Sequence, residues 1–582
     1  MTPAKRRIGS RELLDALLDP GTFVSWDAPP IAVAQTGAYR SVLAEAATAA
    51  GTDESVRTGE GRLRGRRIAV IACEFAFLAG SVGVAAAERI VGAVERATAE
   101  GLPLVVSPTS GGTRMQEGTV AFVQMVKIAG AVAAHKSAGH PYVVYLRNPT
   151  MGGVFASWGS LGHITFAEPG ALIGFLGPRV YEALYGQPFP PGVQTAENLY
   201  RSGVIDGVVE VSVFRRIAHR ALSVFSGIPD EPKSTAGQRY PGAEPIPAAA
   251  SPDRSRAAGR PDSVGDTSSA ASTAVSPTRG RETQAARETE TPEVTSGAVG
   301  PEDAGVLGSR TVRPGGGHRS SRAMEPVEAW ESVRISRRSD RPGLRELLRR
   351  SRERVPLSGT GQGETDRTVV LALARFQGRP CVVFGHDRAH QDPEHTMGPA
   401  ALRSARRSMQ LAAELRLPLV LVIDTIGAAL SKEAEERGLA PEIARCIADL
   451  VTLDTPTVSV LLGQGTGGGA LALLPADRVL AATHGWLAPL PPEGASAIVH
   501  RDTGHAAELA AQQRIRSADL LADGIVDRIV PENPDAAAEP DEFARRMVTA
   551  LGEELAALSA EPVERLREIR HLRYRRLGLA DR

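Results

Sequence analysis

Apolar residues are concentrated in short, nearly continuous runs that alternate with segments of helical pattern. Four such runs occur early in the chain, at Gly65–Phe77, Leu102–Gly112, His140–Gly153 and His163–Phe175. The segment Ile90–Gly101, between the first two, has its apolar residues at helical spacing. Short β-branched runs between helices are typical of strands buried on both faces of a parallel sheet. The pattern therefore predicts an α/β domain with helices outside the sheet.

The C-terminal part of the chain repeats this order of elements. The four runs and the helix have as counterparts Gly378–Arg388, Leu417–Gly427, Thr455–Gly469, Asp477–Leu490 and Ala405–Arg416. The spacing of glycines agrees as well, because Gly152 precedes Gly170 by 18 positions and Gly468 precedes Gly485 by 17. We infer that one α/β unit has been duplicated within the chain.

The two copies are separated by a segment of different composition. Pro, Ser, Thr, Gly, Ala and charged residues dominate it, and no aromatic residue occurs between Tyr240 and Trp330. Such a segment buries too little apolar surface to offset the entropy lost on ordering. We therefore predict a domain at residues 1–225, a disordered linker at 226–325 and a second domain at 326–582. Two domains also agree with a length of 582 residues, which is too great for one core.

Composition and charge argue against several classes of protein. Basic and acidic residues balance at 67 each, so nothing indicates attraction to nucleic acid or to a membrane surface. No apolar run has the length of a membrane span and no signal peptide is evident, so we predict a cytoplasmic protein. The three cysteines, Cys73, Cys381 and Cys446, are too far apart for a disulfide framework or a zinc ribbon, and no metal is expected.

A pair of glycines follows the third strand of each copy. The motif TMGG ends at Gly153 in the first copy, and TGGG ends at Gly469 in the second. Small residues of helical pattern come next, so backbone N–H groups would point outward at the positive end of a helix dipole. Backbone donors of this kind stabilise an oxyanion in many enzymes. The alternative is that these glycines only allow a tight turn or close packing.

Side chains offer few catalytic candidates. The run SGGTRMQEG at 110–118 has another glycine pair, but it lacks the spacing and the lysine of a Walker phosphate loop. Glu117 is placed to act as an acid or base, or to interact with a helix dipole. His163 and His484 occur singly near the fourth strands, where a packed or solvated histidine is the commoner case. There is no G-x-S-x-G elbow and no HExxH motif.

Several long motifs together resemble a known enzyme family. SGGTRMQEG, NPTMGGVFAS, AEPGALIGFLGPRVYE and SGVIDGVV are similar to the β subunit of bacterial acetyl-CoA carboxylase carboxyltransferase. GRPCVVFGHDR, LPLVLVIDTIGA, AEERGLAPEIAR, GQGTGGGALAL and PPEGASAIV are similar to its α subunit. The resemblance covers residues 7–211 and 326–532, in β-then-α order. It implies an α/β fold of two crotonase-like (ClpP/crotonase) ββα-repeat domains, with active sites between a β-type and an α-type domain of different protomers.

The resemblance also implies a reaction, which is the transfer of CO2 from carboxybiotin to the α-carbon of acetyl-CoA or a close short acyl-CoA. Negative charge then develops on the thioester oxygen and on the ureido oxygen of biotin, which calls for two oxyanion holes. By resemblance, Gly152 and Gly153 bind the thioester oxygen. Gly468 and Gly469 bind the biotin oxygen, and the ureido nitrogen takes the α-proton. The implied substrate-binding residues are Gly111, Gly112, Thr113, Arg114, Thr150, Met151, Gly427, Ala470 and Ala472.

The parts that the chain lacks imply partners. No methionine is followed by lysine and no ATP-binding loop is evident, so biotin is expected on a separate carrier protein that a separate biotin carboxylase charges. The zinc ribbon often found in the family is also missing. The motifs DTIGAA at 424–429 and PLPPEG at 489–494 depart from the usual DTPGAY and ISPEG, which leaves the acyl group open. A homodimer or a higher homo-oligomer is expected.

Two other functions remain open at this point. A decarboxylase on the same fold would act on malonyl-type thioesters, with or without biotin. A catalytically altered homologue with a role in assembly or regulation would bind CoA or the carrier without turnover. An enoyl-CoA hydratase is disfavoured, because no pair of carboxylates follows the glycine turns.

Overall fold

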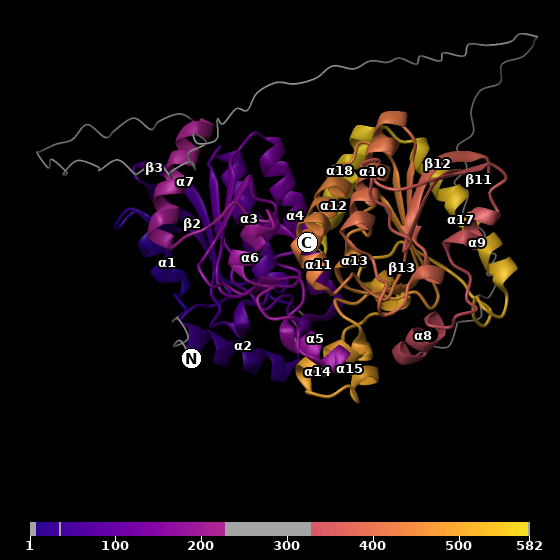
Figure 1. Cartoon of the computed structure of the whole chain (residues 1–582), viewed down its shortest axis with the longest axis horizontal. Helices are drawn as coiled ribbons and strands as arrows, with labels where there is room; N and C mark the ends of the chain where they lie inside the picture. The colour runs from indigo at the N-terminus through magenta and orange to yellow at the C-terminus, as the bar shows by residue number, and fades with distance from the viewer. Residues whose placement is uncertain (1–6, 34–35, 227–327, 580–582) are drawn as a thin grey trace, which may run out of the picture. The chain divides into compact units, whose positions relative to one another are not determined.

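The computed structural model of the chain describes residues 7–33, 36–226 and 328–579 (Figure 1). The predicted linker at 226–325 lies outside these ranges except for Ser226, which ends helix α7. The described residues form two α/β halves, one on each side of that segment in the sequence.

The N-terminal half is built on a seven-stranded sheet. Its strand order is β1-β2-β3-β4-β5-β7-β9, and β6 and β8 form a separate parallel pair. The β1–β2 and β2–β3 pairings are antiparallel, and the other strands are parallel. The strands are β1 Val24–Ser25, β2 Val56–Leu63, β3 Arg66–Cys73, β4 Leu104–Ser107, β5 Tyr142–Leu146, β6 Thr150–Met151, β7 Ile164–Ala167, β8 Ile173–Gly174 and β9 Gly207–Val208. The helices are α1 Ser10–Leu17, α2 Gly37–Ala50, α3 Val84–Ala99, α4 Gly118–Ser137, α5 Pro178–Tyr185, α6 Ala196–Arg201 and α7 Val211–Ser226.

The C-terminal half has a second seven-stranded sheet, in the order β10-β11-β12-β13-β14-β15-β16. Again the first two pairings are antiparallel and the rest are parallel. The strands are β10 Arg354–Leu357, β11 Val369–Phe376, β12 Arg379–His386, β13 Leu419–Thr425, β14 Thr457–Gly465, β15 Arg478–Ala482 and β16 Arg528–Val530. The helices are α8 Ala329–Ser336, α9 Leu344–Arg349, α10 Pro399–Leu415, α11 Lys432–Glu436, α12 Leu439–Thr452, α13 Gly467–Leu471, α14 Pro492–Val499, α15 Ala506–Gln512, α16 Ser517–Ala522, α17 Pro540–Ser559 and α18 Val563–Arg576.

The duplication extends to single bridges outside the main sheets. Short β-bridges join loop residues at corresponding places in the two halves. The matched pairs are Val82–Thr113 with Met397–Ala428, Thr150–Ile173 with Thr466–Ala488, and Leu172–Thr195 with Trp486–Arg516. The two predicted crotonase-like domains are therefore confirmed as copies of one topology.

Each sheet is covered by helices on both faces, as Figure 1 shows within each half. In the N-terminal half, α1 and α7 pack on one face and α3 and α4 on the other. In the C-terminal half, α9 and α17 cover one face and α10 and α12 the other. Helix α4 packs against α12, where a methyl group added at Gly130 would come within 3.0 Å of Val451 Cγ1. One apolar core therefore continues from one half into the other.

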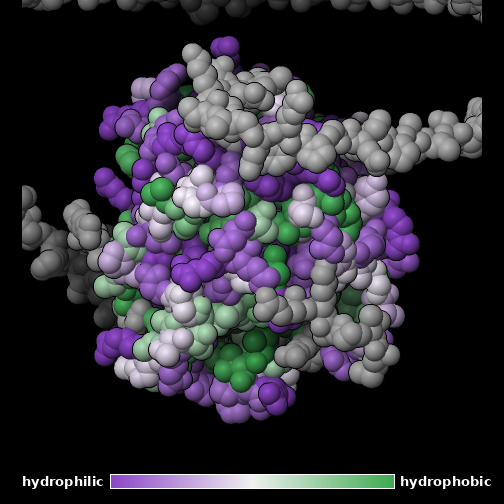
Figure 2. All heavy atoms as spheres, turned by 90° about the vertical axis from the view of Figure 1, so that its left-hand side faces the viewer, coloured by the Kyte–Doolittle hydropathy of each residue, from purple (hydrophilic) through white to green (hydrophobic). Residues whose placement is uncertain are grey.

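One helix, Met115–Ser137, is long and apolar enough to cross a membrane by length and composition alone. In the apolar 18-residue stretch of this helix that meets the length requirement, 83% of the residues are buried inside the protein, as expected of a core helix. Hydrophilic residues dominate the outer face of the molecule that Figure 2 shows, and hydrophobic residues form only separate patches there. The three cysteines Cys73, Cys381 and Cys446 are buried and unpaired.

Candidate active site

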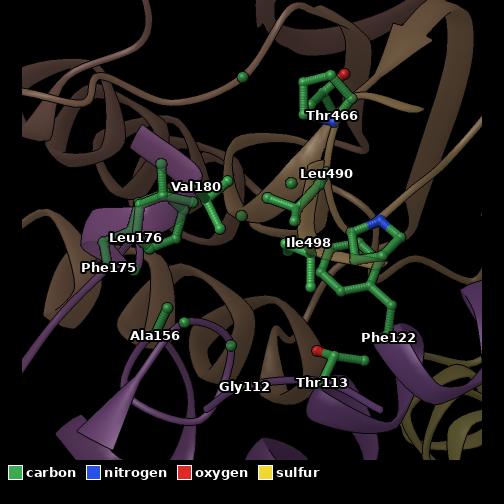
Figure 3. A pocket seen from close by; sticks show the side chains of 18 of the residues that line it. Gly112, Thr113, Phe122, Ala156, Phe175, Leu176, Val180, Thr466, Leu490 and Ile498 are labelled. Carbon is green, nitrogen blue, oxygen red and sulfur yellow. The ribbon is translucent and has the colours of Figure 1, made fainter. Parts of the chain in front are cut away.

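A cavity of about 710 Å³ is lined by residues of both halves. Figure 3 shows Gly112, Thr113 and Phe122 of the N-terminal half together with Leu490 and Ile498 of the C-terminal half around it. Among the described residues that line the cavity there is no Asp, Glu, Lys, Arg or His. The wall is mainly apolar, as is usual for small-molecule sites. Its polar groups are a few hydroxyls, the amide of Gln116 and backbone groups.

The first glycine turn brings Gly152 and Gly153 to the cavity wall. Gly152 has a left-handed φ of 66°, and its N–H donates to the Gly174 carbonyl at 3.1 Å. The N–H of Gly153 has no acceptor within the described ranges, so it is available to a ligand. A methyl group added at Gly153 would lie 3.1 Å from Thr113 Oγ1, so a larger residue there requires the Thr113 side chain to shift by a few tenths of an ångström.

A second source of backbone donors in this half is the loop after β3. Leu78, Ala79 and Gly80 have successive φ values of 44°, 54° and 64°, a left-handed run that costs non-glycine residues about 1–3 kcal/mol each. Leu78 and Ala79 line the cavity, and the Ala79 N–H has no acceptor in the described part of the chain. At Gly80 an added methyl group would lie 2.3 Å from the Thr109 carbonyl oxygen, so glycine is required there.

Sequence reasoning missed this loop. The one signal that it offered was Gly80, because nothing in the residue types Leu78 and Ala79 announces a left-handed backbone.

The second glycine turn lies at the start of α13. Gly467 has a φ of 61° and donates its N–H to the Ala488 carbonyl at 2.9 Å. The N–H groups of Gly468 and Gly469 have no acceptor among the residues that the structure describes, as expected for the first turn of a helix. Gly468 lines the cavity, as does the predicted Gly427, whereas Gly469 is packed behind the wall, where an added methyl group would lie 3.5 Å from Met397 Sδ.

One residue, Phe175, lies next to both glycine turns, with its backbone beside the first and its ring beside the second. A methyl group added at Gly468 would come within 2.8 Å of the Phe175 ring. One added at Gly152 would lie 3.9 Å from the Phe175 carbonyl oxygen. The two turns are therefore separated by about the width of one residue, although they lie some three hundred positions apart in the sequence.

Three other predicted substrate-binding residues, Gly111, Gly112 and Thr113, line the cavity with the first turn. Five do not reach it. They are Arg114, Thr150, Met151, Ala470 and Ala472, all of which are buried.

Arg114 and Thr150 form bonds behind the wall instead. The Arg114 guanidinium donates to the Glu54 carboxylate at 3.0 Å and to the Ser81 carbonyl at 2.7 Å. The Thr150 hydroxyl donates to the Arg147 carbonyl at 2.7 Å. These contacts hold the loops that carry the glycines.

The acid–base candidates also lie outside the cavity. Glu117 accepts hydrogen bonds from the Tyr39 hydroxyl at 2.7 Å and from the Val84 N–H at 2.6 Å, which places its charge at the first residue of α3. The His163 ring accepts from the Tyr142 N–H at 3.0 Å, and the His484 ring contacts the Pro534 carbonyl at 3.2 Å. In the described ranges no group of three or more His, Cys, Asp or Glu could hold a metal ion.

The geometry defines a site in which backbone amides, rather than charged side chains, line the described cavity wall. Comparison with known families agrees. Residues 5–264 match the carboxyl transferase domain family, and residues 317–578 match the family described as acetyl co-enzyme A carboxylase carboxyltransferase-like. The chain belongs to the carboxyl transferase family of biotin-dependent acyl-CoA carboxylases.

Two relatives are similar over nearly their whole lengths. A protein of Mycobacterium tuberculosis (strain ATCC 25618 / H37Rv) named "Probable biotin-dependent acyl-coenzyme A carboxylase beta3 subunit" is 57% identical, over 98% of this chain and 99% of the relative. The "Acetyl-coenzyme A carboxylase carboxyl transferase subunits beta/alpha" of Salinispora arenicola is 34% identical, over 99% of this chain and 91% of the relative. Among solved structures, Transcarboxylase 12S matches with a TM-score of 0.33 and 18% identity, over 95% of this chain and 90% of that one.

Proposed function

We propose that this chain transfers CO2 from carboxybiotin, carried on a separate protein, to the α-carbon of an acyl-CoA. Acetyl-CoA and close short acyl-CoAs are the first candidate substrates, and the product from acetyl-CoA is malonyl-CoA. The observation that carries the proposal is a cavity with no charged side chain among its described lining residues, into which two glycine turns, one from each half, bring backbone N–H groups.

The N-terminal half binds the thioester in this proposal. Removing the α-proton moves electron density onto the thioester oxygen, which becomes enolate-like. The free N–H groups of Gly153 and Ala79 are donors to that oxygen, while Gly152 shapes the turn. Preorganised donors stabilise such charge strongly in a site that excludes water, and losing one typically costs about 10²–10³ in rate.

The C-terminal half binds the ureido group of biotin. The residues present fit such a group, because the N–H of Gly468, which lines the cavity, has no protein acceptor in the described ranges and the side chains of Ile443 and Leu471 line an apolar wall beside it. When bound, carboxybiotin supplies the CO2 and, at the nitrogen that CO2 leaves, the acceptor for the α-proton. A cavity wall without a charged side chain agrees with a reaction that requires no protein base.

The assembly follows from the same reasoning. A biotin carrier protein and a biotin carboxylase complete the enzyme, and a homo-oligomer brings several sites together. Within one chain both halves line the cavity, and an exchange of halves between protomers would build the same wall. We also propose that the two domains span residues 1–225 and 326–582 and that the protein is cytoplasmic.

One assay tests the function. The purified chain, a biotinylated carrier and its carboxylase are incubated with ATP, bicarbonate and a panel of acyl-CoAs from acetyl to octanoyl, and carboxylated products are measured. Carboxylation of at least one acyl-CoA is expected. Release of CO2 from malonyl-CoA without any forward product would instead indicate a decarboxylase. CoA or carrier binding without turnover would indicate an assembly or regulatory role.

A further inference from the structure

Helix α11 of the C-terminal half places a buried carboxylate against the N-terminal half. The side chain of Glu435 accepts hydrogen bonds from the Phe175 backbone N–H at 2.8 Å and from the Gln194 side-chain amide at 2.7 Å. Glu435 is only 5% exposed. Its partners are 260 and 241 positions away in the sequence; Phe175 lines the cavity wall beside the first glycine turn, and Gln194 donates to the carbonyl of the neighbouring Leu176.

The contact leads directly to both glycine turns. Phe175 follows Gly174, whose carbonyl accepts the Gly152 N–H at 3.1 Å. The ring of Phe175 lies against the position where Gly468 would carry a methyl group, at 2.8 Å. By holding the Phe175 backbone, the Glu435 carboxylate therefore helps to position the Gly152–Gly153 turn and the ring that packs against the Gly468 turn.

The same contact is tightly packed. A methyl group added at Gly174 would lie 2.5 Å from the Gln194 amide nitrogen, which also donates to the Leu176 carbonyl at 2.8 Å. The segment has little freedom to shift unless Glu435 and Gln194 move with it.

The carboxylate has no cationic partner. In the described part of the chain no arginine, lysine or histidine forms an ion pair with Glu435. Charged residues also occur on α11 itself and on the helices packed against it, α6 and α12. In the described structure none of them forms an ion pair with the Glu435 carboxylate. They are Lys432, Glu433 and Glu436 on α11, Arg437 just after it, Glu197 and Arg201 on α6, and Glu442, Arg445 and Asp449 on α12.

Burial raises the pKa of the Glu435 carboxyl to about 7, and the hydrogen bonds from Gln194, Phe175 and the Leu176 backbone only partly oppose the rise. Because the folded-state pKa is above that of the unfolded chain, this group's contribution to stability falls as pH rises from about 4.5 to about 7, and it is constant above. The Oε1 atom accepts both the Phe175 N–H and the Gln194 amide, and an ionised carboxylate accepts such bonds more strongly than a protonated one.

We propose that Glu435 is a positioning residue through which the C-terminal half sets the Phe175–Leu176 wall and, by way of Gly174, the oxyanion turn of the N-terminal half. The proposal rests on the carboxyl-transfer function only for its kinetic consequence. Its structural consequence, order in the Phe175–Leu176 segment, is independent of the reaction.

The test compares Glu435→Ala and Glu435→Gln with the matched control Glu436→Gln. Glu436 is next on the same helix and also faces the N-terminal half, where it accepts from the Asn198 side chain at 2.9 Å, but it makes no bond to the wall. Glu435→Ala is expected to lower kcat about tenfold to a hundredfold, the scale of a small misplacement of a catalytic group, with less than about a threefold change in KM for the acyl-CoA. Glu436→Gln is expected to have the wild-type kcat and the wild-type KM.

The pH profile separates positioning from a general loss of structure. The wild-type kcat is expected to rise with pH through about 7 as the carboxylate forms. Glu435→Gln keeps this side chain neutral at every pH. The kcat of this variant should therefore show no inflection near pH 7 and should stay at the low value that the wild type has in acid. A Gln variant with full activity and an unchanged profile would overturn the proposal.

Hydrogen–deuterium exchange of the full-length chain provides a readout that does not need the reaction. The peptide spanning residues 172–178 should exchange at least about tenfold faster in Glu435→Ala than in the wild type, and at the wild-type rate in Glu436→Gln. Equal exchange in all three proteins would overturn the positioning role. If no acyl-CoA is carboxylated yet exchange rises as expected, the proposed function fails and the role of Glu435 in ordering the wall stands.

Discussion

The two halves share one strand order, yet they differ in the loop that follows the third strand of each sheet. In the N-terminal half, after β3, that loop is the left-handed run Leu78–Gly80, which is apolar and lines the cavity. In the C-terminal half, after β12, it is a short helical turn, Arg388–His390, without a positive φ. There Arg388 donates to the Asp424 carboxylate at 2.8 Å. The duplicated scaffold therefore holds an amide-donating loop in one copy and an ion-paired loop in the other.

This difference indicates a division of labour. The N-terminal half brings two left-handed turns to the cavity, Gly152–Gly153 and Leu78–Gly80, whereas the counterpart of the second turn in the C-terminal half has no positive φ. In the proposed reaction negative charge develops on both the thioester oxygen and the ureido oxygen, so each half needs at least one amide donor. We propose that the half with two left-handed turns binds the thioester.

The largest effect is expected from Gly153→Val. The added side chain would press on Thr113 Oγ1, 3.1 Å from the first methyl position, and would cover the free amide. Carboxyl transfer should fall by at least about 10²–10³, measured as kcat with the carrier and acyl-CoA. The control Gly92→Ala, on an exposed part of α3 with no atom within 4 Å of an added methyl group, should retain the rate. A Gly153→Val protein with the wild-type rate would remove the thioester assignment.

Gly468→Val tests the other half. Its first methyl position lies 2.8 Å from both Ile443 Cδ1 and the Phe175 ring, so the turn must move. We expect transfer to drop about 10²-fold while the chain still binds acyl-CoA, measured by calorimetry. Loss of acyl-CoA binding together with transfer would contradict the division between halves.

A contact between the halves far from the cavity should matter for stability rather than for rate. Arg575 on α18 pairs with Glu88 at 2.6 Å and with Glu95 at 2.7 Å in the N-terminal half. Arg575→Ala should lower the free energy of unfolding by about 1 kcal/mol, measured by chemical denaturation, and change kcat less than about twofold. Arg565→Ala, an exposed change on the same helix, serves as the reference. A large fall in kcat would show that α18 acts on the site.

The smallest effect is expected from Ala79→Gly. Glycine keeps the backbone N–H and accepts a φ of 54° without strain, so kcat should stay within about threefold. Relief of strain and the larger entropy of the unfolded chain oppose each other, and the free energy of unfolding should change by less than about 1 kcal/mol. A tenfold loss of kcat would mean that the Ala79 methyl group, not its amide, contributes to the site.

Much of the fold could be predicted from the sequence. The apolar runs around Val105 and Val420 both became buried central strands, and the repeated spacing became two sheets of one strand order. The family assignment is confirmed too, because long motifs in a fixed order identify a family better than any one glycine pair. Of the proposed catalytic residues, Gly152, Gly153 and Gly468 line one cavity, while their roles in catalysis stay predictions.

Other residues could not be placed from the sequence. Arg114 lies in the SGGTRMQEG motif, and the family resemblance implies that it binds substrate. In the structure it is 1% exposed and bound to Glu54, sixty positions earlier in the chain. A charged side chain next to a glycine turn can support the turn from behind, and only its partners reveal which side it faces.

The sequence by itself determined the elements, the duplication and the glycines at the two turns, because these depend on local backbone geometry and on which residues can be buried. Tertiary structure decided what meets across the cavity. The left-handed conformation of Leu78 and Ala79 is imposed by packing against their preferences. The bond from Glu435 to the Phe175 backbone joins groups 260 positions apart. Such contacts depend on how two finished halves fit together, and no local pattern encodes that fit.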